Sequence, residues 1–117
     1  MSKLKLSSTV PQVVTILNGA ALSEAIVFGP YSKGVIHMPA AWTAADIGFH
    51  ISSDPDGVYQ PLYDGANPVV ISGPDADRVF PLPAGLAPAH YFKLWSNTAG
   101  ADTNQGADRV IIVELKA

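Results

Sequence analysis

Apolar and polar residues alternate along several short stretches of this chain, and the clearest stretch lies near its middle. Ile47, Phe49 and Ile51 alternate there with small or polar residues, which is the pattern of a strand that packs one face on a core. The turn-forming sequence Ser-Asp-Pro-Asp-Gly follows, and an extended pattern resumes at residues 58–63. These features predict a β-hairpin with its loop at residues 53–57.

A second alternating stretch lies closer to the C-terminus. Phe92 and Leu94 occupy one side of this expected strand, and Tyr91, Lys93 and Trp95 occupy the other. If Phe92 and Leu94 face the core, the aromatic side of this strand faces outward.

The last expected strand, at residues 109–115, places Ile111, Val113 and Leu115 on one face. The opposite face carries Val110, Ile112 and Glu114. Together the three alternating stretches predict one core that contains Ile47, Phe49, Ile51, Phe92, Leu94, Ile111 and Val113.

Short β-branched or apolar runs between turn signals predict the other strands. They are expected at residues 13–17, 24–28, 33–38, 69–72 and 78–82. Trp42 is expected to close one end of the fold, residues 82–88 to cross an end as an irregular or single-turn segment, and residues 98–107 to form the longest loop. The pattern predicts an all-β, single-domain antiparallel β-sandwich of about eight strands.

The N-terminal residues 1–12 are expected to form an arm, and residues 13–117 the sandwich. Leu4 and Leu6 alternate with lysines in this arm. Such a segment is either a frayed terminus or an extended arm that adds to the sheet edge of a neighbouring molecule. The two leucines are therefore candidate interface residues.

Composition narrows the range of partners. Only 15% of the 117 residues are charged and 48% are apolar, so we expect part of the surface to be covered by a partner. The net charge is −3 and the seven Lys and Arg are scattered, which argues against nucleic acid as a ligand. No cysteine is present and no run of apolar residues is long enough for a membrane span, so we expect neither disulfides nor membrane insertion.

No set of residues has the spacing that catalysis or metal binding requires. His37, His50 and His90 fall in different expected strands or strand entrances, without the spacing of a metal site. The DPDG turn alone is too short to supply the roughly six oxygens of a calcium site. No nucleophile motif and no glycine-rich phosphate loop is found. We therefore expect no catalytic, cofactor-binding or metal-binding residues, and not an enzyme.

Two segments resemble a known architecture. They are IGFHISSDPDGVYQPLYD at residues 47–64, and LAPAHYFKLWSNT at residues 86–98 followed by DRVIIVEL at residues 108–115. Together they resemble the middle and C-terminal strands of a discoidin-like jelly roll. This resemblance implies a jelly-roll form of the sandwich.

The whole pattern, including NGAALSEAI at residues 18–26 and NQGADRVIIVEL at residues 104–115, resembles small accessory proteins encoded among the structural genes of tailed bacteriophages. The resemblance implies a virion component made in the host cytoplasm, either a capsid decoration or a tail-associated protein. Its partners would be major capsid or tail proteins, and it would form a homo-oligomer.

The aromatic residues allow a second interpretation. Tyr59 and Tyr63 are expected on one face of the hairpin, and with Tyr91, Lys93 and Trp95 they are candidates for an exposed patch that meets a protein or stacks on a sugar. Alternatively, these side chains fill the second face of the sandwich. The alternative function is a carbohydrate-binding module that holds a glycan with loops 54–57 and 98–106 at one end.

Overall fold

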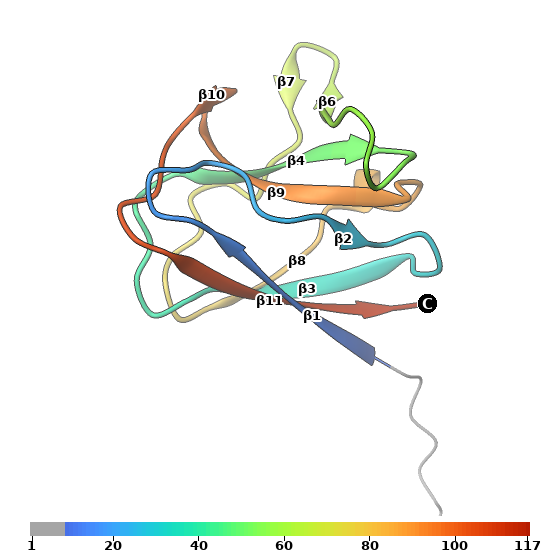
Figure 1. Ribbon diagram of the computed structural model, residues 1–117, viewed down its shortest axis with the longest axis horizontal. Coiled ribbons are helices and arrows are strands. Elements are labelled where there is room, and N and C mark those ends of the chain that lie inside the picture. Colours follow the sequence, from blue (N-terminus) through green and yellow to red (C-terminus); the bar gives the residue numbers. More distant parts are fainter. Residues whose placement is uncertain (1–8) are drawn as a thin grey trace, which may run out of the picture.

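The computed structural model describes residues 9–117, which form two antiparallel sheets packed face to face (Figure 1). The first, the β11 sheet, has the order β1 (Thr9–Ile16), β11 (Arg109–Lys116), β3 (Lys33–His37) and β8 (Val79–Pro81). The second, the β9 sheet, has the order β10 (Ala101–Asp102), β9 (Tyr91–Thr98), β4 (Asp46–Ser52) and β5 (Gln60–Pro61), and β2 (Ile26–Val27) also pairs with β9.

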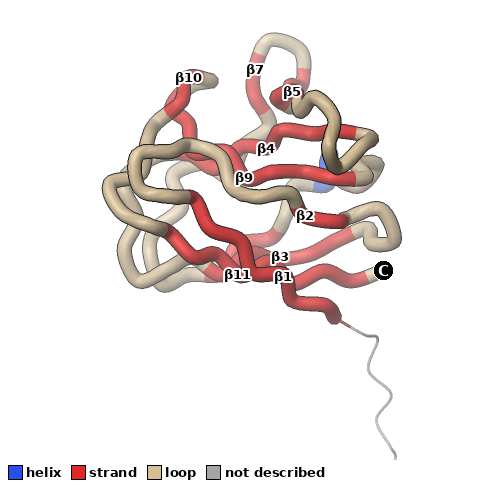
Figure 2. The backbone as a smooth tube through the Cα atoms, in the orientation of Figure 1, coloured by secondary structure: helices blue, strands red, loops and turns tan. Residues whose placement is uncertain are grey.

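The remaining elements are small. β6 (Tyr63–Asp64) and β7 (Asn67–Pro68) form a separate ribbon that projects from the β9 sheet (Figure 1). A 3-10 turn, η1 (Ala84–Leu86), lies in the segment between β8 and β9, as expected for residues 82–88. Figure 2 shows how short strands and long connections alternate along the backbone.

The strand order is that of a jelly roll. The eight main strands, taken in chain order, are β1, β2, β3, β4, β5, β8, β9 and β11. The first, eighth, third and sixth of these form one sheet, and the second, seventh, fourth and fifth form the other. This arrangement contains the two Greek keys of the jelly roll. The β6–β7 ribbon and β10 are insertions into this plan.

The core forms where the inner faces of the two sheets meet. Six of the seven expected core residues are completely buried, at 0% exposure, while Ile51 is partly buried at the margin of the core. Ile51 lies near the end of β4, where its neighbour β5 has only two residues. At the centre, Phe92 makes edge-to-face contacts with Phe28 and Phe49, with ring centroids 5.3 and 5.7 Å apart.

Strand β1 begins at Thr9, four residues before the expected start of the sandwich. The boundary of the arm at residue 12 is therefore wrong for residues 9–12, which pair with β11. Pro11 does not interrupt this ladder because its nitrogen faces away from β11. Thr15 lies on the same side of the strand as Pro11, and its N–H points outward, to Glu24. The rest of the arm, including Leu4 and Leu6, lies outside the described residues.

The expected strand at residues 58–63 is divided into two. Leu62 donates its N–H to Phe49 O and so continues the contact with β4. Its own carbonyl accepts from Val69 N, and the chain then leaves the sheet to form the β6–β7 ribbon. The strand expected at residues 69–72 is reduced to one bridge between Ile71 and Ile47.

Candidate interaction surfaces

The outer face of β9 carries Tyr91, Lys93 and Trp95, as the alternation predicts. Trp95 is nevertheless only 3% exposed. It lies opposite Gly48 on β4, where a Cβ atom would come within 2.8 Å of Trp95 Cε3, so the indole packs directly over the glycine backbone. Its Nε1 donates a hydrogen bond of 2.7 Å to Asp102 Oδ1 on β10. Trp95 therefore fills the second face of the β9 sheet, as the alternative interpretation expected.

His50 packs beside this tryptophan. The two rings meet edge to face with centroids 4.6 Å apart, and His50 Nε2 is buried without a hydrogen-bond partner among the described residues. Burial lowers the pKa of His50 below its ordinary value, with a further lowering by Lys93 and an opposing effect of Asp102. The neutral imidazole is therefore favoured in the folded protein.

Lys93 and Tyr59 form a second contact on this face. The ammonium of Lys93 lies 4.6 Å from the centre of the Tyr59 ring, within the range of a cation–π interaction. The Tyr59 hydroxyl donates to Pro55 O at 2.9 Å. Burial raises the pKa of Tyr59, and the nearby Asp56 and Asp54 raise it further. Lys93 and Tyr59 are thus held together beside the loop at residues 53–57.

Tyr63 does not join Tyr59, contrary to the expectation that both share one face of a hairpin. The break at Leu62 places Tyr63 on the β6–β7 ribbon, where it is 43% exposed. Its hydroxyl lies against Gly100, since a Cβ atom there would come within 2.6 Å of Tyr63 Oη. Gly100 belongs to the turn after β9. Tyr63 and Tyr59 therefore lie near opposite ends of the β4–β9 ladder.

The two loops of the carbohydrate hypothesis also lie apart. Loop 54–57 follows Ser52 at the end of β4, and loop 98–106 extends from the end of β9. Because β4 and β9 run antiparallel and Ser52 pairs with Tyr91 at the start of β9, the loops lie at opposite ends of the ladder. Seven residue pairs separate them, which corresponds to about 20 Å. The expectation of one loop site at one end is therefore wrong.

The outer face of the β11 sheet is a larger surface that the sequence analysis did not select. Several aliphatic side chains of this face are exposed to solvent: Val13 is 62% exposed, Val79 54%, Val110 51% and Ile112 39%. The alternation around Ile112 was visible in the sequence, but the sequence did not show whether a helix, a loop or solvent covers that face. The face is completed by Pro11, Val35 and Pro81.

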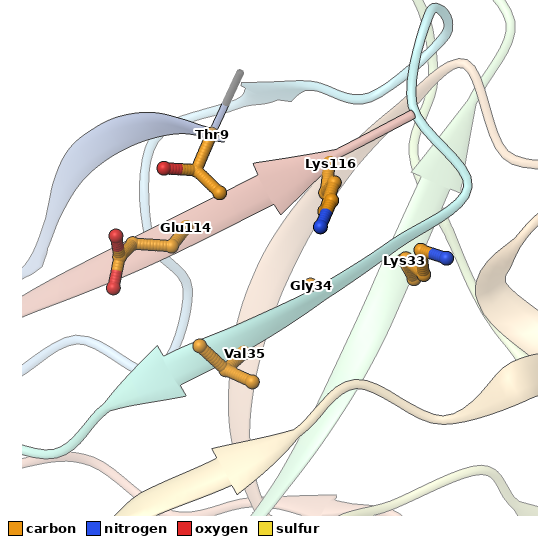
Figure 3. A pocket seen from close by; sticks show the side chains of 6 residues that line it. All are labelled: Thr9, Lys33, Gly34, Val35, Glu114 and Lys116. Carbon is orange, nitrogen blue, oxygen red and sulfur yellow. The ribbon is translucent and has the colours of Figure 1, made fainter. Parts of the chain in front are cut away.

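Polar groups interrupt this face at two places. Near its centre, His37 Nε2 and Glu114 Oε1 lie 2.5 Å apart, in a pair that is about one-third exposed on each side. At one end, Lys33 and Lys116 are direct cross-strand partners on β3 and β11. Figure 3 shows these two lysines beside Val35 and Glu114 at a shallow hollow of about 280 Å³. Within residues 9–117, neither lysine has a carboxylate partner at ion-pair distance.

Side-chain hydrogen bonds connect the free edge of β1 with the neighbouring segment at and before β2. The Gln12 amide donates to Val27 O at 2.8 Å and accepts from Val27 N at 3.1 Å, so it acts as a strand partner for β2. The outward N–H of Thr15 donates to Glu24 Oε1 at 2.7 Å. Pro11 has no N–H to offer. This edge therefore presents few free donors to an incoming strand.

Two kinds of site were sought in the described part of the chain. Residues 9–117 contain no group of three or more His, Cys, Asp or Glu side chains that could hold a metal ion. No helix in this part is long and apolar enough to cross a membrane.

Comparison with known proteins shows a shared fold. No protein-family model matches this sequence, and no curated protein matches it. Among solved structures, the chain is similar to the crystal structure of the SPBc2 prophage-derived protein YomS, with a TM-score of 0.54 and 14% sequence identity. The match covers 98% of this chain and 100% of YomS. The chain thus shares its β-sandwich fold, over nearly its whole length, with a protein of prophage origin.

Proposed function

We propose that this chain is a non-enzymatic structural protein of a phage particle, either a capsid decoration or a tail-associated protein that works as a homo-oligomer. The observation that carries this proposal is the outer face of the β11 sheet. Four aliphatic side chains of one sheet face are between 39% and 62% exposed. A protein with 15% charged residues gains most from such a face when another molecule covers it.

Two further observations support a place in a particle. The full-length likeness to a prophage-derived protein agrees with the resemblance of the sequence to phage accessory proteins. The protected edge of β1 suits a protein that is concentrated on a surface, because an open strand edge would promote sheet addition between neighbours.

Particle fractionation tests the proposal. The phage that encodes the chain is purified by density gradient, and the chain is quantified by mass spectrometry in particles and in the soluble lysate. We expect many copies per particle, in constant ratio to the major capsid or tail protein. Recovery of the chain only from the soluble lysate would contradict the proposal.

A variant pair makes the test specific for the β11 sheet. Ile112→Asp places a charge on the exposed face and is expected to reduce incorporation into particles. Val58→Asp is the matched control, because Val58 is also aliphatic and is 82% exposed in the loop before β5. Equal incorporation of the two variants would show that the β11 sheet is not the surface that assembly requires.

A further inference from the structure

The exposed residues of the β11 sheet form ordered rows across its strands. The register places Val13, Ile112, His37 and Val79 in one row, since each is the cross-strand partner of the next. This row crosses β11 midway between Asp108, just before the strand, and Lys116 at its end. The face therefore has a mainly aliphatic middle, interrupted by the His37–Glu114 pair, and two distinct ends.

The two ends carry opposite charges. Lys116 and Lys33 are cross-strand partners at one end, where two like charges repel. Glu114, the carboxylate in the same hollow, is paired with His37. At the other end, Asp108 lines a hollow with Thr15 and Val110, and Glu24 and Lys93 also line it. Neither Asp108 nor the two lysines make an ion pair within the described residues.

The surroundings of Asp108 leave its charge available. One carboxylate oxygen, Oδ1, accepts from Asn18 N at 2.8 Å, a contact to a neutral group. Arg109 follows Asp108 directly, but its guanidinium is bound to Gln105 and Thr43. Asp108 is exposed, and Lys93 in the same hollow does not reach it at ion-pair distance within the described residues, so its carboxylate can meet a cation of a partner molecule.

We propose that the outer face of the β11 sheet binds a second copy of the chain, with the strands of the two copies running in opposite directions. The twofold axis lies between the stacked sheets, perpendicular to the strands, at the level of the Ile112 row. Ile112 then meets Ile112 of the second copy, and Val13 meets its own equivalent. Lys116 faces Asp108 of the second copy, and this contact is made twice.

Stacking of faces is favoured over pairing of strand edges. On the free edge of β1, Pro11 has no N–H and the Thr15 N–H is bound to Glu24. β8, at the other edge of the sheet, has only three residues and ends with Pro81. A second copy consequently finds few free backbone groups at either edge. The aliphatic face is the open surface of this sheet.

The size of the face predicts a weak dimer. β1 and β11 have eight residues each, β3 has five and β8 has three. At the usual strand rise and spacing they correspond to roughly 400 Å² per copy, or about 800 Å² in total. Stable complexes usually bury about 1,200–2,000 Å². The dimer should therefore depend on concentration in solution and gain strength where many copies are held together.

Sedimentation equilibrium of the full chain, from micromolar to millimolar concentration, tests the inference. We expect a reversible monomer–dimer equilibrium that Ile112→Asp abolishes while circular dichroism and the melting temperature stay unchanged. Val110→Asp on the same face should have the same effect. A chain that remains monomeric at millimolar concentration would overturn the inference.

Charge exchange tests the direction of stacking. Lys116→Glu alone and Asp108→Lys alone should each weaken the dimer by about tenfold or more, since each replaces two attractive contacts with two repulsive ones. The double variant Lys116→Glu/Asp108→Lys should dimerise like the natural chain. Asp56→Lys, in the loop after β4 and away from this face, is the matched control and should have no effect.

The outcomes separate this inference from the proposed function. Single exchanges without effect, or a double variant as weak as the single ones, would overturn the antiparallel pairing. If the chain stays monomeric in solution but its incorporation into particles still depends on Ile112, the inference fails and the proposed role in the particle stands, with any oligomer formed only on the particle. If the dimer forms but no copies are found in particles, the proposed function fails and the inference stands.

Discussion

Gln105 offers the sharpest test of how this fold is held together. Its side chain is 1% exposed although it lies in a polar connection between β10 and β11. Its amide donates to Thr43 O at 3.1 Å and to Ser96 Oγ at 2.8 Å. Its oxygen accepts from Thr43 N at 2.9 Å and from Arg109 Nε at 3.1 Å. One side chain thus joins the loop before β4 to β9 and β11.

Gln105→Leu keeps the approximate volume and removes all four hydrogen bonds. A hydrogen bond contributes about 1 kcal/mol net, and a buried group left without a partner costs about 1–3 kcal/mol. Thr43 and Arg109 are only partly buried, so water can replace some of the lost contacts. We therefore expect a loss of roughly 3–4 kcal/mol, a large part of the 5–15 kcal/mol typical of a domain.

Urea unfolding followed by tryptophan fluorescence measures this loss. Gln60→Leu is the control, because the Gln60 side chain is exposed on β5. Gln105→Glu separates hydrogen bonding from volume: it keeps the shape but loses both N–H donors, and it should remain clearly destabilised. A loss below about 1 kcal/mol for Gln105→Leu would refute the reasoning, since it would mean that water satisfies all four partners.

Three further predictions concern the core, the pH dependence and the arm. Phe49→Ala should cost about 3–5 kcal/mol in chemical unfolding, because Phe49 is fully buried against Phe92; a loss below about 1 kcal/mol would contradict its position. His50 has a lowered pKa when folded, so its contribution to stability is complete above the unfolded-state pKa of about 6.5 and decreases as the pH falls below that value. His50→Gln should therefore reduce the fall in melting temperature between about pH 7 and pH 5, and an unchanged pH profile would rule out this role. Deleting residues 1–8 should leave the melting temperature nearly unchanged and weaken particle binding; equal binding of the shortened chain would show that the arm has no role in assembly.

The sequence predicted those strands whose two faces differ in polarity. Residues such as Phe92 and Ile111 alternate with polar or aromatic neighbours, and both are buried as expected. The topology was suggested by resemblance alone, because alternation says which face is buried but not which strands are neighbours. The start of β1 was missed because Pro11 is a usual strand breaker, tolerated here on the free side of an edge strand.

Other features depend on tertiary contacts that no local pattern records. The β9–β10 turn has positive φ at Ala99, 51°, and at Gly100, 85°. Alanine is not a usual residue for such a turn, so the sequence predicted one long loop and β10 was missed. The sequence left open whether Trp95 is exposed or covers the second face of the sandwich, and its burial depends on Gly48 across the ladder. Gln105 lies in a stretch without periodicity, and its burial follows from partners far away in the sequence.

The covered edge of β1 also affects how the chain behaves before and during assembly. Pro11 offers no N–H, and Glu24 binds the outward N–H of Thr15, at positions where a growing fibril would add its next strand. Glu24 is held at this edge by one side-chain hydrogen bond, so its replacement should change little in the folded molecule while opening a template for cross-β growth. Selection on these positions would then act through the yield of usable protein in a crowded cell, and not through the stability of the sandwich.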